Sequence, residues 1–115
     1  MNSDCLFCEI VNGNLKVDIL KETEYSVAFK DINPQAPCHI LIIPKLHIAS
    51  TLEINDNNIF YLSEMALLAK EIAKKNKNIK GGYRWIINTG IDGGQTVDHL
   101  HLHLIGGRKM LWPPG

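Results

Sequence analysis

The 115-residue chain predicts a single α+β domain, residues 1–115, in which a five-stranded antiparallel sheet packs against one long helix. Three observations predict this fold class. Five short segments have strand-like composition or alternation, one segment has the three-and-four spacing of an amphipathic helix, and that helix separates the third strand from the fourth. No apolar run approaches the roughly 20 residues that a membrane-spanning helix requires.

The N-terminal third contains a short helix and two strands. Residues 6–11 are mostly apolar and predict one or two helical turns, which Gly13 ends. Residues 17–22 alternate loosely, as an edge strand does, and residues 25–32 are rich in β-branched and aromatic side chains. The two prolines of residues 33–37 then predict a turn, because proline removes a backbone donor.

The middle of the chain contains a buried strand and the long helix. Residues 39–44 are almost continuously apolar, which predicts a central strand buried on both faces. In residues 59–77 apolar side chains recur every three or four positions and form one stripe. Lysines concentrate at the C-terminal end of this helix, as the helix dipole favours, and Gly81 and Gly82 end it.

The C-terminal third contains two strands joined by a glycine-rich loop. Residues 83–88 predict the fourth strand, and residues 88–96 form a loop whose backbone N–H groups can approach a phosphate. Histidine and leucine then alternate strictly. A period of two directs the leucines toward a core and directs His99, His101 and His103 toward the opposite face of a strand.

Three interpretations of this histidine row are open. The histidines could lie on an exposed sheet face, or bind zinc, since His-x-His on a strand is a common zinc geometry. They could also include a nucleophile that attacks phosphorus, with the other histidines assisting. Imidazole has a pKa near 6.5 and is largely neutral at physiological pH. The glycine loop and Asn88 supply neutral donors, which favours phosphorus chemistry.

Composition argues against two classes of partner. Twelve basic and twelve acidic residues give no net charge, which argues against broad attraction to nucleic acid or to a membrane surface.

The first residues lack the basic-then-apolar pattern of a signal peptide, so a cytoplasmic protein is expected. The odd number of cysteines argues against a disulfide framework.

The row from His99 to Ile105 resembles the histidine-triad (HIT) signature, in which three histidines alternate with apolar residues. The resemblance covers essentially the whole chain, and its other matching segments are residues 31–37, 39–45, 88 with 92–96, and 106–115. The tail Trp112–Gly115 is similar to that of the Hint branch, the purine nucleoside phosphoramidate hydrolases. The resemblance implies a homodimer in which two five-stranded sheets join into one sheet of ten strands.

The same resemblance implies a mechanism. His101 matches the nucleophile that attacks the α-phosphorus of a nucleoside 5′-phosphoramidate or acyl nucleotide, forming a covalent nucleotidyl-histidine that water releases as the monophosphate. His39 matches a histidine implicated in proton relay, and His99 and His103 match orienting and phosphate-contacting members. Rival activities are hydrolysis of dinucleoside polyphosphates, nucleotidyl transfer, and nucleotide-dependent binding of protein partners.

The resemblance also implies a substrate pocket. Asp31 matches a carboxylate that binds both ribose hydroxyls, which requires an acceptor. The residues that match an apolar slot for the purine base are Leu6, Phe7, Ile10, Phe29 and Ile32. The residues that match positions near the α-phosphate, the leaving group or the C-terminal tail are Asn88, Gly94, Gln95, Thr96 and Trp112. The family usually has serine at position 96, so threonine adds a methyl group beside the leaving group.

The CxxC pair Cys5 and Cys8 leaves redox, zinc and incidental roles open. A redox role requires a strand-to-helix context like that of thioredoxin, which the start of this chain does not offer. A tetrahedral zinc site requires two more ligands. Some HIT-superfamily members add a histidine after the His39-like strand and the first histidine of the triad, here His47 and His99. We therefore expect a structural zinc, and no cofactor that the chemistry requires.

Overall fold

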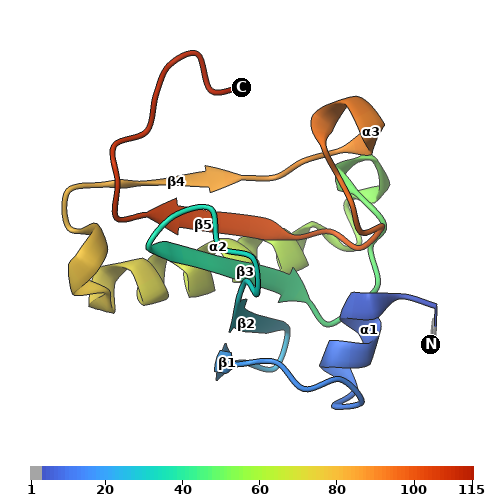
Figure 1. Ribbon diagram of the computed structural model, residues 1–115. Helices are drawn as coiled ribbons and strands as arrows, with labels where there is room; N and C mark the ends of the chain where they lie inside the picture. The colour runs from blue at the N-terminus through green and yellow to red at the C-terminus, as the bar shows by residue number, and fades with distance from the viewer. Residues whose placement is uncertain (1–3) are drawn as a thin grey trace.

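The computed structural model describes residues 4–115 and has the predicted α+β fold, with a five-stranded antiparallel sheet in the order β1-β2-β3-β5-β4 (Figure 1). The strands are β1 (Ile19–Glu22), β2 (Ser26–Lys30), β3 (Cys38–Pro44), β4 (Tyr83–Ile86) and β5 (Leu102–Gly106). The helices are α1 (Leu6–Val11), α2 (Ile59–Lys75) and α3 (Gly90–Gly93), with 3₁₀ turns η1 (Thr51–Glu53) and η2 (Lys77–Ile79).

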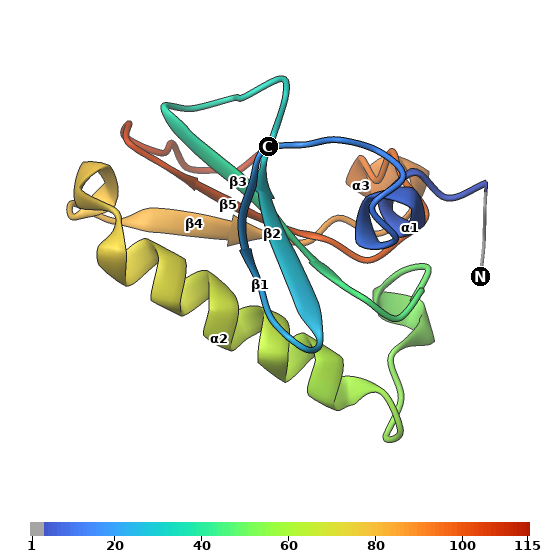
Figure 2. The same ribbon diagram turned by 90° about the horizontal axis from the view of Figure 1, so that it is seen from below.

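Helix α2 covers one face of the sheet, as Figure 2 shows. Its apolar stripe includes Met65 and Ala69, which are fully buried against the side chains of β3 and β5 that face it, such as Ile42 and Leu104. Burying each large aliphatic side chain contributes about 1.5–3 kcal/mol. The prediction of one long amphipathic helix is confirmed, and it ends at Lys75, two residues earlier than its spacing suggested.

The other face of the sheet forms a second core with α1. Phe7 and Ile10 of this helix pack against β-strand residues that include Phe29 and Leu41. The prediction of β3 as a central strand is confirmed, because all seven of its residues are buried and it pairs with both β2 and β5. Helices α1 and α3 both lie at one end of the sheet (Figures 1 and 2).

Two local predictions require correction. The paired part of β5 begins at Leu102, opposite Ile42, so His99 and His101 precede the hydrogen-bonded strand. The glycine-rich loop contains the single helical turn α3, because Gly94 adopts a left-handed conformation (φ 85°) in which its N–H closes the turn on the carbonyls of Gly90 and Ile91. Among the described residues, every helix is too short or too polar to cross a membrane.

Candidate active site and metal centre

The first two histidines of the row are buried, and His103 is half-buried. His99 is 0% exposed and His101 is 4% exposed, which excludes the interpretation of an exposed sheet face for both. The leucines between them, such as Leu100, are buried in the core under α2. The alternation therefore places the leucines on the side of the sheet that α2 covers and the histidines on the side that α1 covers.

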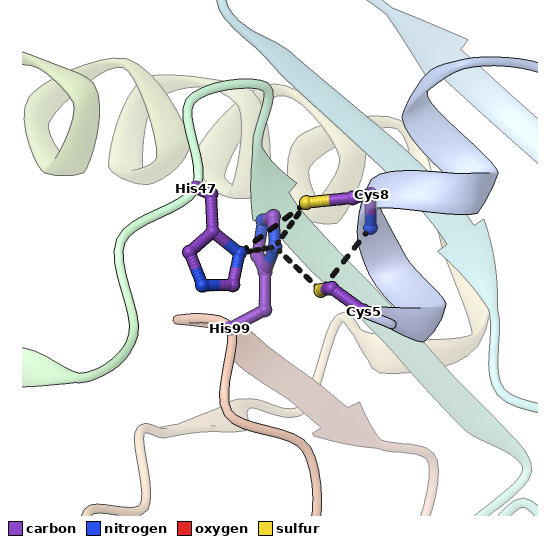
Figure 3. Close-up of side chains that lie close together, drawn as sticks. All are labelled: Cys5, Cys8, His47 and His99. Atoms are coloured by element: carbon purple, nitrogen blue, oxygen red, sulfur yellow. Dashed lines mark hydrogen bonds between the residues drawn. The ribbon is translucent and has the colours of Figure 1, made fainter. Parts of the chain in front are cut away.

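One group of side chains brings together Cys5 and Cys8 from α1 and its N-cap, His47 from the loop after β3, and His99 (Figure 3). We refer to these four residues as the cysteine–histidine cluster. The Nδ1 atom of His99 lies 3.2 Å from Cys5 Sγ and 3.6 Å from Cys8 Sγ. The Nδ1 atom of His47 lies 3.3 Å from Cys8 Sγ and 3.2 Å from His99 Nδ1.

These separations fit a tetrahedral metal ion. With Zn–S of about 2.3 Å and Zn–N of about 2.0 Å, neighbouring ligand atoms lie about 3.3–3.8 Å apart. The ring of His99 has the required tautomer, because Nε2 lies 2.9 Å from the carbonyl oxygen of Pro44. A carbonyl only accepts, so Nε2 carries the proton and Nδ1 presents a lone pair to the cluster. The residues present therefore fit a structural zinc.

A second group, which we call the histidine–aspartate cluster, contains Asp31, His39 and His103. The backbone N–H of Gln35 donates to His39 Nδ1 at 3.0 Å, so the proton of that ring is on Nε2. His39 Nε2 lies 2.9 Å from His103 Nδ1 and 3.3 Å from Asp31 Oδ2. His39 therefore donates to His103, whose own proton is on Nε2.

The histidine–aspartate cluster does not fit a metal ion as well as the first. A metal bound at His39 Nε2 would displace the ring proton to Nδ1, where it would face the Gln35 N–H. The 2.9 Å between the two ring nitrogens is also a hydrogen-bond distance, and is shorter than the separation of about 3.3 Å between nitrogens on one zinc. The geometry favours a chain of hydrogen bonds.

His101 lies between the two clusters. Its Nδ1 lies 2.7 Å from the carbonyl oxygen of His99, so Nδ1 donates, and in the neutral form of the ring Nε2 carries the lone pair. The Phe7 ring packs edge-on against the imidazole at 5.1 Å between centroids, and the His103 ring packs at 5.0 Å. A neutral imidazole held in this way is suited to nucleophilic attack.

Burial keeps the histidines around His101 neutral. Burial, helped by the neighbouring His101 and His39 rings, lowers the pKa of His103 from 6.5 to about 4, and Asp31 opposes this effect. Burial also lowers the pKa of His39, again opposed by Asp31. The pKa of His99 is lowered to about 4, mainly by burial. Neutral rings are what the hydrogen-bond directions require.

A cavity of about 320 Å³ lies beside His101 and His103. The predicted pocket residues that line it are Leu6, Phe7, Ile10, Phe29, Asp31, Ile32, Thr96, His101 and His103. Its other lining residues, which the sequence analysis missed, are Leu15, Lys16, Val17, Lys30, Leu41 and Val97. The sequence pattern could have predicted Leu41, because it follows His39 by two residues on a strand and therefore lies on the same face of the sheet.

The remaining predicted substrate residues lie outside the wall of this cavity. The Gln95 side chain binds backbone instead: Nε2 donates to Ala49 O at 2.8 Å and to Val97 O at 2.9 Å, and Oε1 accepts from Gly90 N–H. Trp112 is 82% exposed in the C-terminal tail. Asn88 and Gly94 flank α3 and do not line the cavity of the protomer. Their roles stay predictions.

Comparison with known proteins identifies the family. Residues 4–112 match the family model described as scavenger mRNA decapping enzyme C-term binding. An uncharacterized HIT-like protein of Synechococcus elongatus is 46% identical over 115 residues, which is all of both chains. The chain belongs to the histidine-triad (HIT) family.

Solved HIT structures have the same fold. A HIT family hydrolase from Legionella pneumophila superposes with a TM-score of 0.93 at 46% identity, covering 96% of this chain and 99% of that one. A histidine triad protein from Clostridium difficile superposes with a TM-score of 0.91 at 40% identity, covering 96% of both chains. This HIT protein is therefore hydrolase-like.

Proposed function

We propose that this HIT protein hydrolyses the P–N bond of purine nucleoside 5′-phosphoramidates, and acyl nucleotides in the same way, through a nucleotidyl intermediate on His101. The observation that carries the proposal is the opposite protonation of two rings at one cavity. His101 has its lone pair on Nε2 because Nδ1–H donates to His99 O. His103 has its proton on Nε2 because Nδ1 accepts from His39. One ring is thus a nucleophile and the other a donor to the phosphate.

The cavity supports binding of one nucleoside. Its volume, about 320 Å³, lies at the lower end of the range for small-molecule sites. Apolar side chains such as Phe7 and Phe29 line the cavity and would contact a flat base. The Asp31 carboxylate accepts from the Asn33 N–H at 2.8 Å through Oδ1, and its remaining lone pairs suit two ribose hydroxyl groups.

In the first step, His101 Nε2 attacks the α-phosphorus and the P–N bond breaks. The proton on Nδ1 stays hydrogen-bonded to the His99 carbonyl, which stabilises the charge that develops on the imidazole. His103 Nε2–H donates to a non-bridging phosphoryl oxygen. The leaving nitrogen takes one proton from solvent and departs as an amine beside the Thr96 hydroxyl, which lies in the cavity wall.

In the second step, water attacks the same phosphorus and the bond to His101 Nε2 breaks. The imidazole leaves in its original neutral form, and the water gives up one proton as the nucleoside monophosphate is released. Each step needs positioning and charge stabilisation by the chain's own groups. Neutral His103 and His39 repeat their donor roles in both steps.

A second activity, hydrolysis of dinucleoside polyphosphates, is favoured by one observation, the match to a family model named for a decapping enzyme. Two observations favour the phosphoramidate. The cavity has the size of one nucleoside, so a second would lie outside it. The tail ending in Trp112 to Gly115 is the feature similar to the Hint branch. Nucleotidyl transfer and a scaffold function remain as alternatives for the same pocket.

We further propose that zinc occupies the cysteine–histidine cluster and that its role is structural. The ligands would be Cys5, Cys8, His47 and His99, and zinc would link α1 to the segment before β5. The metal takes part in neither step of the proposed reaction. Loss of zinc is therefore expected to weaken the fold and to leave a measurable activity.

A homodimer is the proposed assembly. Strand β4 is an edge of the sheet with unpaired backbone groups. Trp85 on this strand is 42% exposed, and Leu111 and Trp112 in the tail are 73% and 82% exposed. Covering these apolar side chains with a second copy would extend the sheet to ten strands. Purine nucleotides in the cytoplasm are the partners we expect, because a chain with no net charge has no broad attraction to nucleic acid.

Adduct trapping tests the proposed function directly. The protein is mixed with adenosine 5′-phosphoramidate, quenched within one turnover, and digested for mass spectrometry. An adenylyl group on His101 is expected, and His101→Ala should lose turnover while binding adenosine monophosphate. An adduct elsewhere, or turnover by the variant, would show that the nucleophile is wrong. Faster cleavage of diadenosine polyphosphates than of the phosphoramidate would favour the second activity.

A further inference from the structure

The candidate nucleophile is not held by the sheet. The ladder between β3 and β5 begins with the pair Ile42 and Leu102, so residues 99–101 precede it. In this stretch, the N–H of Leu100 donates to Ile48 O at 2.6 Å. The orientation of the His101 ring depends on its bond to the carbonyl of His99, and so on what fixes residue 99.

The side chain of His99 fixes that residue from two sides. Its Nδ1 lies within the cysteine–histidine cluster, 3.2 Å from both Cys5 Sγ and His47 Nδ1. Its Nε2–H donates to the Pro44 carbonyl at the end of β3. One residue therefore has its ring in the candidate metal centre and its carbonyl on the candidate nucleophile. The main chain of His99 therefore connects the candidate metal centre to the candidate nucleophile.

Helix α1 provides a second connection. Phe7 lies between the two cysteines in sequence, and its ring packs edge-on against His99 at 5.9 Å and against His101 at 5.1 Å. The same helix places Leu6 and Ile10 in the cavity wall. The cluster thus holds the backbone acceptor on one side of the His101 ring and the aromatic contact on another.

We infer that Cys5, Cys8 and His47 set the rate of the chemical step, because they fix His99 and so determine how well its carbonyl positions His101. This inference rests on the proposed function, and assigns the cluster an effect on rate beyond stability. A displacement of about 1 Å at a reacting group can cost on the order of 10²-fold in rate. Releasing His99 should therefore slow attack on phosphorus, whereas removing His101 should abolish it.

The test compares His47→Ala with His47→Cys. His47 contributes one atom to the cluster and does not line the cavity, so its replacement leaves the substrate contacts in place. Elemental analysis of His47→Ala should find no zinc. Its kcat should be about 10–100-fold lower than that of the wild type, which is the usual range when a supporting contact at a metal site is lost. Its affinity for adenosine monophosphate should stay within about threefold, well below the tenfold that 1.4 kcal/mol produces. His47→Cys restores a ligand and should recover zinc and kcat.

Nitrogen-15 NMR adds a readout independent of turnover. The Nδ1–H of His101, held by the His99 carbonyl, should give a slowly exchanging signal in the wild type and in His47→Cys, and should be lost in His47→Ala. Cys38→Ala is the control, since Cys38 is a buried cysteine in the core under α2. It should keep zinc, signal and kcat. If His47→Ala does not fold, wild-type protein stripped reversibly with a chelator replaces it.

The outcomes separate the two proposals. A His47→Ala protein that lacks zinc but keeps wild-type kcat and the His101 signal would overturn the positioning role and leave the proposed function standing. Retention of zinc by that variant would overturn the ligand set. Equal losses in nucleotide affinity and in kcat would indicate that the whole pocket had loosened, and would also overturn the positioning role of His99. Turnover by His101→Ala would instead defeat the proposed function.

Discussion

Within residues 4–115, two clusters combine histidine with acidic or thiol groups, and the two differ in their outer hydrogen bonds. In the cysteine–histidine cluster, the outer nitrogen of His99 donates to a carbonyl, so a lone pair faces inward. In the histidine–aspartate cluster, the outer nitrogen of His39 accepts from a backbone N–H, so a proton faces inward. Both clusters hold ligand-type atoms within 4.8 Å of one another.

The comparison teaches that proximity of ligand-type side chains does not by itself make a metal site. The group on the far side of each ring decides whether the near side offers a lone pair or a proton. A carbonyl acceptor from Pro44 favours metal binding, and a donor from Gln35 favours a hydrogen-bond chain. His101 lies between them with its own tautomer set by a carbonyl. Four predictions test this difference between the clusters, and they follow in order of decreasing effect.

Zinc removal should destabilise the fold through one cluster only. With free zinc at about 1,000 times its dissociation constant, the bound ion adds about 4 kcal/mol to the free energy of unfolding. Urea unfolding with zinc and with a chelator measures this difference. The double variant Cys5→Ser, Cys8→Ser should have the same free energy of unfolding with zinc and with the chelator. The variant His103→Gln should keep the full difference. An equal response to zinc in the double variant would place the metal elsewhere.

His39→Ala should impair turnover without affecting zinc. The substitution removes the donor to His103 Nδ1, so that ring no longer has a specified tautomer. Loss of one positioned proton-transfer or donor group costs on the order of 10²-fold in kcat. Steady-state kinetics and elemental analysis on the same sample make the comparison. Loss of zinc together with activity would mean that the two clusters are one unit.

Asp31→Asn should affect binding more than chemistry. Exchanging a charged acceptor for an amide loses a charge-assisted hydrogen bond, about 1.5 kcal/mol, which corresponds to a KM about tenfold higher. The 2′-deoxy analogue of the substrate provides the control: the wild type should discriminate against it and the variant should not. The same 2′-deoxy penalty in both proteins would remove Asp31 from ribose recognition.

The smallest expected effect is on stability as the pH falls. The folded pKa of His103, about 4, lies below its ordinary value of 6.5, so the unfolded chain binds more protons between these values. The contribution of neutral His103 is therefore full above pH 6.5 and is lost as the pH falls through about 4. Solvent screening of this half-buried ring keeps the effect modest. His103→Gln should flatten this part of the stability curve, and an unchanged slope would contradict the assignment.

Most of the fold was predictable because local patterns encode it. The apolar run of β3 indicated a central strand, and the spacing in α2 indicated a helix with one buried stripe. The start of β5 was not predictable in this way, since His99 and His101 continue the alternation but precede the paired strand. Alternation specifies which face a side chain takes, whereas strand pairing depends on where the neighbouring strand ends.

The candidate site also has features that local sequence patterns predict and features that depend on distant segments. The sequence alone determined the residue types, namely the triad, the CxxC pair and an acidic residue before a turn, together with the face that each histidine occupies. The protonation of His99 and His103 depends on tertiary structure, because their partners come from distant segments: Pro44 is 55 residues from His99, and His39 is 64 residues from His103. The partners of His101 and His39 are close in sequence, at His99 and Gln35. Side-chain periodicity contains no information about which backbone carbonyl or N–H will lie behind a ring. Packing of β3 against β5 and the chain before it supplies that information for His99, whose Nδ1 then faces the cysteines, and for His103, whose Nε2 then carries the proton.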